Sequence, residues 1–271
     1  MEEEYILPKV SVLMATRNGH KYLKEAITSI LCQSFSDFEF IICNDHSSDD
    51  TAKIIEHFRK NDNRIKVFEN EFPDGFTSAL NYGLEHCEGK YIARMDDDDI
   101  SHPDRLAIEA EYLDQYPMIS IVSTNVNFFD SNGIYGRTSK INLPTNKDIW
   151  RGKIFTHPAV MFRKKDLSLV GQYSTSKDVT RIEDYDFWCK FYSYGLKGIN
   201  LPNTLLDYRE DHFSLKKRNA IRKVRLVKCM HKWRKRLNIP IYYDVFMVYE
   251  LMKILVPQRL IGTYHRVHFK L

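Results

Sequence analysis

The sequence predicts an α/β protein in which a mostly parallel central sheet is flanked by helices and followed by a C-terminal helical appendage. In the first 124 residues, short runs rich in β-branched and aromatic side chains alternate with segments of helical periodicity. Polar or acidic residues follow several of these runs, as at the ligand-binding edge of a parallel sheet. The 271 residues, of which 43% are hydrophobic, are enough for a full core, which excludes a disordered or fibrous chain.

The elements are expected in a strand–helix order along the chain. Strands are predicted at residues 10–15, 38–43, 65–68, 91–95, 119–124 and 158–163. Helices are predicted at residues 22–31, 48–58, 77–85, 103–116 and 184–194. Ser48 or Asp49 can cap the second helix, and Pro103 suits the first turn of the fourth. Residues 125–156 are expected to form loops and short strands.

Composition limits where such a protein works. The five cysteines are widely spaced, odd in number and form no CxxC pair, which is typical of buried thiols in a reducing compartment. The acidic start, Met1-Glu2-Glu3-Glu4, indicates no export signal, and no run of about 18 apolar residues predicts a membrane-spanning helix. We therefore expect a cytoplasmic protein, either free or attached to a membrane surface.

The net charge of +4 is divided unevenly along the chain. Residues 1–211 carry 25 Lys+Arg against 34 Asp+Glu, a balance of −9, whereas residues 212–271 carry 15 Lys+Arg against 2 acids, a balance of +13. An acidic body with a basic tail predicts chemistry in the body and attachment to an anionic partner through the tail. We accordingly expect a domain at 1–211 and a helical tail at 212–271.

The segments after the predicted strands point to a metal and phosphate site. Thr16-Arg17-Asn18-Gly19 follows the first strand, and Asp96-Asp97-Asp98-Asp99 follows the fourth. No glycine-rich dinucleotide motif or P-loop is present. Four adjacent carboxylates repel one another unless a hard divalent cation binds them, which predicts Mn²⁺ or Mg²⁺ with substrate phosphates as further ligands. The alternative is a solvated acidic turn.

Residues 10–18, 38–51, 89–106 and 183–191 together resemble glycosyltransferase family 2, the inverting enzymes with a GT-A fold. The resemblance extends over about residues 10–214. It implies a UDP-sugar donor bound by residues 1–124 and an acceptor bound by residues 125–211. It also implies a role in building bacterial surface polysaccharides.

The resemblance assigns the donor side residue by residue. Ala15 and Arg17 occupy positions that contact the nucleoside, and Asp45 matches the aspartate that binds the base. His46 stands where the family has a glycine, so the local backbone conformation is open.

Asp96, Asp97 and Asp98 cover the family's DxD segment. The register with Pro103 makes Asp98 the direct metal ligand, with Asp96 or Asp97 nearer the ribose.

The acceptor side is assigned in the same way. Inversion needs a base that takes the acceptor's hydroxyl proton, and Asp184 in Glu183-Asp184 matches that base. The alternative for these acids is stabilisation of the positive end of a helix. Glu183 is a candidate acceptor-side residue. Trp188, on the same helix face as Asp184, is either a wall that stacks on sugar or a core tryptophan. His157 is expected to be structural.

Arg209 and His212 lie in a segment that resembles one closing over the donor diphosphate. Either residue is a candidate contact to the phosphate or the metal, and surface charge is the equal alternative.

The basic tail has the pattern of an amphipathic helix. Residues 216–236 contain eleven Lys+Arg and no acid, with apolar side chains every three or four positions, and a second apolar segment follows at 243–256. Binding to an anionic membrane leaflet and packing on the body are equal alternatives, of which we choose the membrane. No motif supports nucleic-acid binding.

The sequence therefore predicts a metal-dependent inverting transferase that moves a hexose or N-acetylhexosamine from UDP to a glycan or lipid-linked acceptor. It would act at the cytoplasmic face of the inner membrane. One alternative is a sugar nucleotidyltransferase, which would normally have a glycine- and lysine-rich loop after the first strand. The other is a non-catalytic module that binds glycan or membrane, against which the intact acidic motifs argue.

Overall fold

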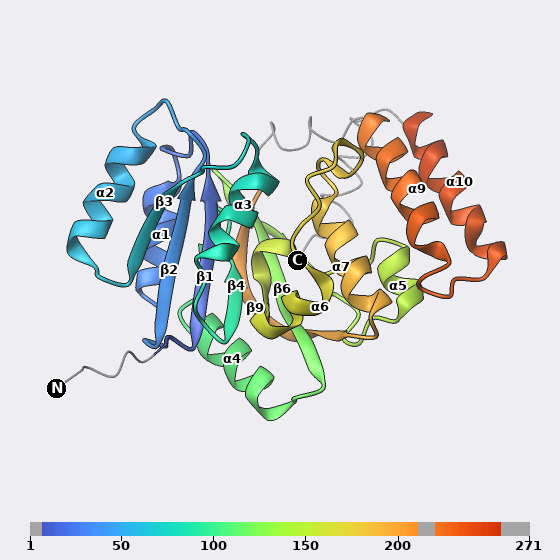
Figure 1. The fold of residues 1–271 in the computed structure, drawn as a ribbon, viewed down its shortest axis with the longest axis horizontal. Helices are drawn as coiled ribbons and strands as arrows, with labels where there is room; N and C mark the ends of the chain where they lie inside the picture. The colour runs from blue at the N-terminus through green and yellow to red at the C-terminus, as the bar shows by residue number, and fades with distance from the viewer. Residues whose placement is uncertain (1–6, 211–219, 256–271) are drawn as a thin grey trace.

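The computed structural model describes residues 7–210 and 220–255. Its centre is a nine-stranded sheet in the order β3-β2-β1-β4-β8-β6-β9-β5, with β7 paired to β6 (Figure 1). The strands are β1 (Val10–Thr16), β2 (Phe38–Asn44), β3 (Ile65–Glu69), β4 (Tyr91–Arg94), β5 (Ile100–Ser101), β6 (Ile119–Asp130), β7 (Gly133–Arg137), β8 (Val160–Arg163) and β9 (Lys197–Arg209). The α-helices are α1 (Leu23–Leu31), α2 (Thr51–Asn61), α3 (Phe76–Glu85), α4 (Arg105–Gln115), α5 (Asn146–Trp150), α6 (Leu167–Val170), α7 (Glu183–Ser193), α9 (Ala220–Arg234) and α10 (Val245–Met252).

The predicted mostly parallel sheet is confirmed. Strands β1, β2, β3 and β4 pair in parallel, and β9 is parallel to β6. Because β8 is antiparallel to both β4 and β6, the strands on either side of it run in the same direction. The carboxyl ends of β1, β2, β3 and β4 therefore meet at one edge, where the loops that follow them lie together.

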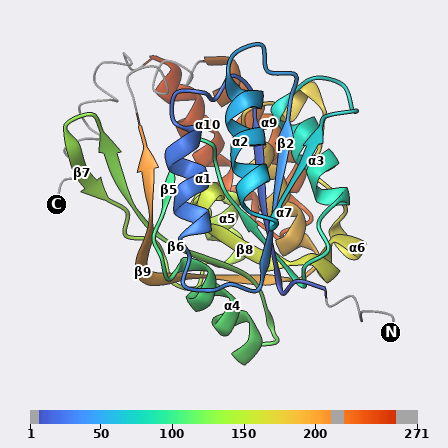
Figure 2. The same ribbon diagram turned by 90° about the vertical axis from the view of Figure 1, so that its left-hand side faces the viewer.

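Helices cover both faces of the sheet because its strands are buried on both sides. Along β1, Val12 and Met14 face one hydrophobic cluster while Leu13 and Ala15 face the other. The first cluster includes side chains of α1, α2 and α4, and the second includes side chains of α3, α5 and α7. Figure 2 shows α1 and α2 side by side in front of the strands.

Two regions differ from the sequence-based expectation. The segment expected to hold loops and short strands contains the second half of β6, the strand β7 and the short helix α5. Strand β9 was not predicted, because Gly198 and Pro202 interrupt its pattern. A side chain at position 198 would collide with the ring of Phe155, so the glycine allows that ring to pack against the strand.

The described part of the basic tail packs on the body. In α9, Cys229, Met230 and Trp233 are buried in the same cluster as α7. The Trp233 indole N–H and Lys232 Nζ both donate to Oδ1 of Asp186 in α7, each at 2.7 Å. The packing alternative therefore describes the apolar stripe of α9, which Figure 1 shows beside α7. Residues 211–219, which include His212, and residues 256–271 lie outside the described residues.

Replacing Trp233 with alanine tests whether α9 belongs to the folded body. The substitution removes a side chain that is 1% exposed together with its hydrogen bond to Asp186. We expect the free energy of unfolding, measured by urea denaturation, to fall by about 3–5 kcal/mol. His231→Ala, on the exposed side of the same helix, is the control and should change it by less than about 0.5 kcal/mol. Equal losses for the two variants would contradict this packing role.

Candidate active site

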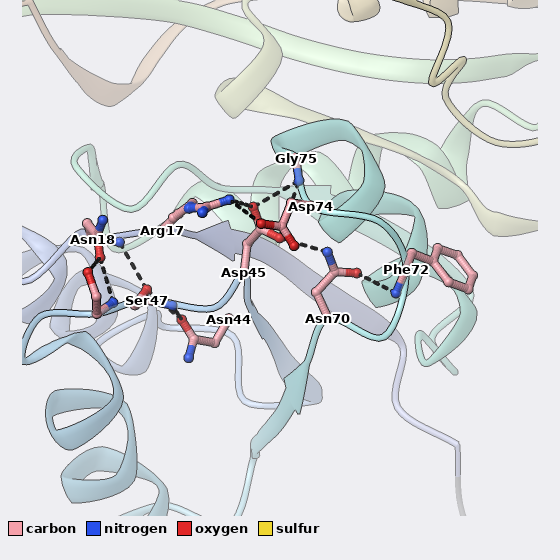
Figure 3. Close-up of polar contacts among 10 residues, drawn as sticks. Arg17, Asn18, Asn44, Asp45, Ser47, Asn70, Phe72, Asp74 and Gly75 are labelled. Atoms are coloured by element: carbon pink, nitrogen blue, oxygen red, sulfur yellow. Dashed lines mark hydrogen bonds and ion pairs between the residues drawn. The ribbon is translucent and has the colours of Figure 1, made fainter.

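Asp45 organises the first part of the site, at the end of β2 (Figure 3). Its carboxylate is buried and accepts hydrogen bonds from Asn70 Nδ2 at 2.7 Å and from the Gly75 backbone N–H at 3.1 Å. Arg17 forms ion pairs at 3.3 Å with both Asp45 and Asp74. The loops that follow β1, β2 and β3 are thus joined around one buried negative charge, in the position predicted for base recognition.

The loops after β1 and β2 are also joined directly. The Asn18 backbone N–H donates to Ser47 Oγ at 2.9 Å, and Asn18 Oδ1 accepts from the Ser48 backbone N–H at 2.8 Å. His46 has a φ of 53°, in the left-handed region that favours glycine. This chain therefore adopts a glycine-type backbone conformation at the position where the resemblance has a glycine. Ala15 is the residue before Thr16, which ends β1, and its methyl group lies in the core.

Sequence reasoning missed Asn70, Asp74 and Gly75. They follow β3, at the same edge as the loops after β1 and β2, but only the segments after the first, second and fourth strands were considered. The rule that ligands bind beyond the carboxyl ends of parallel strands would have found them.

The acidic segment after β4 is held from two directions. Arg94, whose side chain is wholly buried, donates from a guanidinium N–H to Asp96 Oδ1. Asp97 Oδ2 accepts a short hydrogen bond from Thr16 Oγ1, so Asp97 is tied to the end of β1. A Cβ atom at Gly19 would collide with this Asp97 oxygen and with Thr16. Gly19 therefore lets the loop after β1 lie directly against the acidic segment.

The remaining aspartates form a cluster. Carboxylate oxygens of Asp96, Asp98 and Asp99 lie within 4.8 Å of one another. Burial, and then the charges of Asp96 and Asp97, raise the pKa of Asp98 to about 7. Burial and the charge of Asp98 also raise the pKa of Asp99. Asp99 Oδ1 accepts from the Arg209 backbone N–H at 2.8 Å, whereas its buried Oδ2 has no hydrogen-bond partner among the described residues.

These donors fit a hard divalent cation. Mn²⁺ and Mg²⁺ prefer carboxylate oxygens as ligands. The three carboxylates supply such oxygens, one of them buried without a partner among the described residues, and their negative charge would be neutralised by the cation. Asp97, which is bonded to Thr16, lies outside this group, and Asp99 is an additional candidate that the DxD resemblance did not assign.

Arg209 is not a simple surface charge, so that alternative is wrong. Its guanidinium lies between the rings of Tyr22 and Phe129, 3.9 and 4.4 Å from their centroids. Its Nε donates to the Asp98 carbonyl oxygen at 2.7 Å, and a second N–H donates to Glu25 at 2.6 Å. Arg209, at the end of β9, thus joins the acidic segment after β4 to β9 and to Glu25 of α1.

Asp184 lies on the other side of the site, in the first turn of α7. Burial raises the pKa of this carboxyl, while the charge of Arg222 and backbone N–H groups of the first turn oppose the rise. Asp96 acts on Asp184 through its charge. Burial first, and then the charge of Asp184, raise the pKa of Glu183 to about 7. Two neighbouring carboxyls thus have raised pKa values, and the charge of one of them, Asp184, interacts with the acidic segment.

Aromatic packing fixes the helix that carries Asp184. Trp188 is 0% exposed and packs edge-on against Phe155 and Phe162. A fully buried ring cannot stack on a sugar in this conformation, so the interpretation as a sugar-stacking wall is corrected to that of a core tryptophan. His157 Nε2 is 2.9 Å from the Tyr173 hydroxyl, and burial lowers the pKa of His157, as expected for a structural histidine.

Lys140 is a second residue that sequence reasoning missed. Burial lowers the pKa of its ammonium, the charge of Asp184 opposes that shift, and its Nζ donates to the Ile154 carbonyl oxygen at 3.2 Å. It therefore places a basic side chain close enough to Asp184 for their charges to interact. It lies in a segment after β7 that carries no motif, so nothing in the sequence pattern marked it.

Gly19→Ala tests the close approach of the first loop to the acidic segment. Because the added methyl group must displace Asp97 or Thr16, we expect Mn²⁺-dependent affinity for UDP to fall by about tenfold. Isothermal titration calorimetry measures it. Lys21→Ala, an exposed change in the same loop, should leave the affinity within about twofold. Unchanged affinity in Gly19→Ala would contradict the proposed contact.

Comparison with known proteins identifies the family. The family model for glycosyl transferase family 2 matches residues 11–171. The chain is 34% identical over 221 residues to the O-antigen biosynthesis glycosyltransferase WbnJ of Escherichia coli, covering 78% of this chain and 84% of WbnJ. It is 31% identical over 260 residues to EpsE of Bacillus subtilis, covering 96% of this chain and 94% of EpsE. It is also 31% identical over 223 residues to the UDP-Gal:alpha-D-GlcNAc-diphosphoundecaprenol beta-1,3-galactosyltransferase of Escherichia coli, covering 79% of each chain.

Solved structures show the same fold. TarS of S. aureus in complex with UDP-GlcNAc superposes with a TM-score of 0.64 at 19% identity, over 93% of this chain and 82% of that one. The mannosyltransferase PcManGT from Pyrobaculum calidifontis, in complex with GDP-Man and Mn²⁺, superposes with a TM-score of 0.68 at 18% identity, over 94% of this chain and 72% of that one. Both are GT-A glycosyltransferases. With the matched family model and the sequence relatives, this makes the chain a GT-A enzyme that belongs to glycosyltransferase family 2.

Proposed function

We propose that this enzyme transfers a hexose or N-acetylhexosamine, with inversion, from a UDP-sugar to a lipid-linked glycan acceptor. The observation that carries the proposal is the mutual placement of two acidic groups. The Asp96, Asp98 and Asp99 cluster comes from the end of β4, whereas Asp184 comes from α7, and the charges of Asp96 and Asp184 interact. A phosphate-binding centre and a base on opposite sides of one site are what an inverting displacement requires.

The donor nucleotide is assigned to the loops around Asp45. Its carboxylate is the acceptor group that a uracil N–H needs, and Arg17 beside it adds a cation at the same rim. An E. coli relative is named for UDP-Gal, and TarS was crystallised with UDP-GlcNAc, which supports a UDP-sugar. PcManGT holds GDP-Man, so GDP-mannose is the informative competitor.

The acidic segment is proposed to hold the diphosphate through a divalent cation. Asp98 is the proposed direct ligand, with Asp96 and Asp99 close enough to share it and Asp96 or Asp97 nearer the ribose. When bound, the ion would neutralise negative charge that develops on the departing diphosphate. Arg209 holds the backbone of this segment in place, and its guanidinium is a further candidate contact to the diphosphate. The Mn²⁺ in PcManGT supports the choice of metal.

Asp184 is the proposed base. Burial raises its pKa, which makes the carboxylate a better proton acceptor, while the charge of Arg222 and the backbone N–H groups at the start of α7 oppose that rise. Glu183 beside it is the proposed acceptor-side partner. The cation of Lys140 adds a group that can contact an acceptor hydroxyl or anion.

The acceptor is proposed to be a lipid-linked glycan. Two relatives are named for undecaprenol-diphosphate-linked acceptors, one of them 31% and the other 40% identical over their matched residues. Among the described residues, no helix is long and apolar enough to cross a bilayer. An enzyme with such an acceptor would work on the cytoplasmic face of the membrane through a surface contact.

A donor panel with and without metal tests the whole proposal. We expect Mn²⁺ or Mg²⁺ to support UDP release from one or more of UDP-glucose, UDP-galactose, UDP-GlcNAc and UDP-GalNAc. EDTA should abolish this release because the acidic cluster alone repels the diphosphate. Coupled detection of the released nucleotide measures both. Preference for GDP-mannose, or turnover that persists in EDTA, would contradict the donor and metal assignments.

Asp184→Asn tests the base. We expect kcat to fall by about 10²- to 10⁴-fold while Mn²⁺-dependent binding of UDP is retained, because only the proton acceptor is removed. Kinetics and calorimetry on the same preparation separate the two effects. Asp178→Asn, an exposed change five residues before α7, is the control and should keep kcat within about twofold.

The pH dependence of kcat/KM is a second readout of the same base. A base works in its ionised form, so activity should fall as pH drops through the raised pKa of Asp184. Glu183, with a pKa of about 7, is itself protonated at acid pH, so Glu183→Gln should leave this acid limb in place. An acid limb that is unchanged in the residual activity of Asp184→Asn would overturn the assignment.

A further inference from the structure

The helix α10 is apolar on all sides although it lies at the surface. Of its eight residues, VFMVYELM, Glu250 alone is charged. Its inner side chains, Phe246 and Met247, pack against the core cluster together with Tyr243 from the turn that precedes the helix. Figure 1 shows α10 at the edge of the molecule, beyond α9. A helix that is hydrophobic all round is normally covered on every side.

The opposite side of this segment is an exposed apolar stripe, which we call the outer face. It consists of Ile241, Tyr242, Val245, Val248, Tyr249 and Met252. Their spacing places them on one side of the turn at Ile241–Asp244 and of α10. Each is 56–72% exposed, so the outer face is a continuous apolar surface rather than a set of isolated residues.

Exposed cations flank the segment that carries the outer face. Arg151 lies with its guanidinium 4.0 Å from the ring centroid of Phe246, and Lys147 lies 5.2 Å from that of Tyr243, both on the side where the segment meets the body. Lys235 and Arg236 are exposed in the connection that leads to this segment. The two acids of the tail are both neutralised: Asp244 pairs with Arg234 at 3.5 Å, and Glu250 pairs with Lys253 at 2.5 Å.

We propose that the outer face of α10 lies in the surface of an anionic membrane. The apolar stripe would enter the boundary between headgroups and acyl chains, Tyr242 and Tyr249 would sit at headgroup level, and the bordering cations would meet anionic lipid. Charge complementarity selects this occupant: a surface that is basic at its rim, in a tail with a balance of +13, matches an anionic leaflet and would repel a second copy.

Of the two tail segments that the sequence pattern offered for a membrane contact, α10 has the larger exposed apolar face. In α9, Cys229, Met230 and Trp233 are buried against the body, and only the first turns leave apolar side chains exposed, at Ile221 and Val224. Helix α10 packs on α9, and α9 is bonded to α7, which carries Asp184. The contact would therefore hold the acceptor half of the enzyme at the membrane. The membrane contact rests on the proposed function only for the reason why the enzyme would bind a membrane, since the proposed lipid-linked acceptor lies in the membrane.

Sedimentation with vesicles tests the proposal on the full-length protein. We expect binding to vesicles of phosphatidylglycerol and phosphatidylcholine, and weak binding to phosphatidylcholine alone. The triple variant Val245→Ser/Val248→Ser/Met252→Ser should bind the anionic vesicles at least about tenfold more weakly, because three apolar side chains no longer enter the lipid. The matched control Met118→Ser/Ile134→Ser/Leu169→Ser removes three exposed apolar side chains elsewhere and should bind as the native protein does.

The outcomes separate this inference from the proposed function. UDP release measured without lipid should be equal in the native protein and the α10 variant, which also shows that the variant is folded. Equal vesicle binding by the native protein and the α10 variant would overturn the inference. So would light scattering that shows a dimer of the native protein without lipid and no such dimer in the α10 variant. Vesicle binding through α10 by a protein without transferase activity would uphold this inference and refute the proposed function.

Discussion

The repulsion among four consecutive aspartates at the end of β4 is the constraint on which the site depends. Three of the four carboxylates have a hydrogen-bond partner: Asp96 meets the buried Arg94, Asp97 meets Thr16, and Asp99 meets the backbone of Arg209. Burial and neighbouring charges still raise the pKa of Asp98 to about 7 and the pKa of Asp99 well above its usual range. These contacts hold the segment in place without removing the repulsion. The proposed divalent cation would remove it.

The contacts that hold this segment also join distant parts of the sheet. Thr16 ends β1, whereas Arg209 ends β9, which pairs with β6. Arg94 acts through its charge on Asp97 and on His157, which lies beside the aromatic core under α7. The acidic cluster and Asp184 are therefore both anchored to elements whose side chains are buried. Rigid placement of this kind is what an in-line displacement needs, because small errors in geometry reduce the rate strongly.

Local pattern was enough to predict the strands, helices and acidic motifs of the nucleotide half, because each element there is short and regular. It was not enough for β9, whose 13 residues include a glycine and a proline and are held by pairing with β6. Asn70 and Asp74 follow a predicted strand and could have been found from that position, but the pattern does not show that they meet Asp45. Lys140 lay beyond the reach of local pattern, because nothing next to it in the sequence marks it and only the fold brings it near Asp184. For Arg209, a ligand contact and a surface charge were equal alternatives until its two aromatic neighbours, Tyr22 and Phe129, were in place.

The tail shows why periodicity alone does not reveal what an apolar stripe contacts. The sequence pattern of the tail predicts apolar stripes in two segments, one in α9 and one in α10. The two stripes have different surroundings in the structure. In α9 the stripe includes Trp233 and meets a buried acceptor, Asp186, so the helix becomes part of the core. In α10 only one side has a partner in the body, and the other side keeps its apolar residues exposed among cations. The basic residues of α9 that pair with the body, such as Lys232, are thereby removed from the charge available to lipid. Of the two described tail helices, α10 has the larger exposed apolar face, and the proposed membrane contact is placed there for this reason.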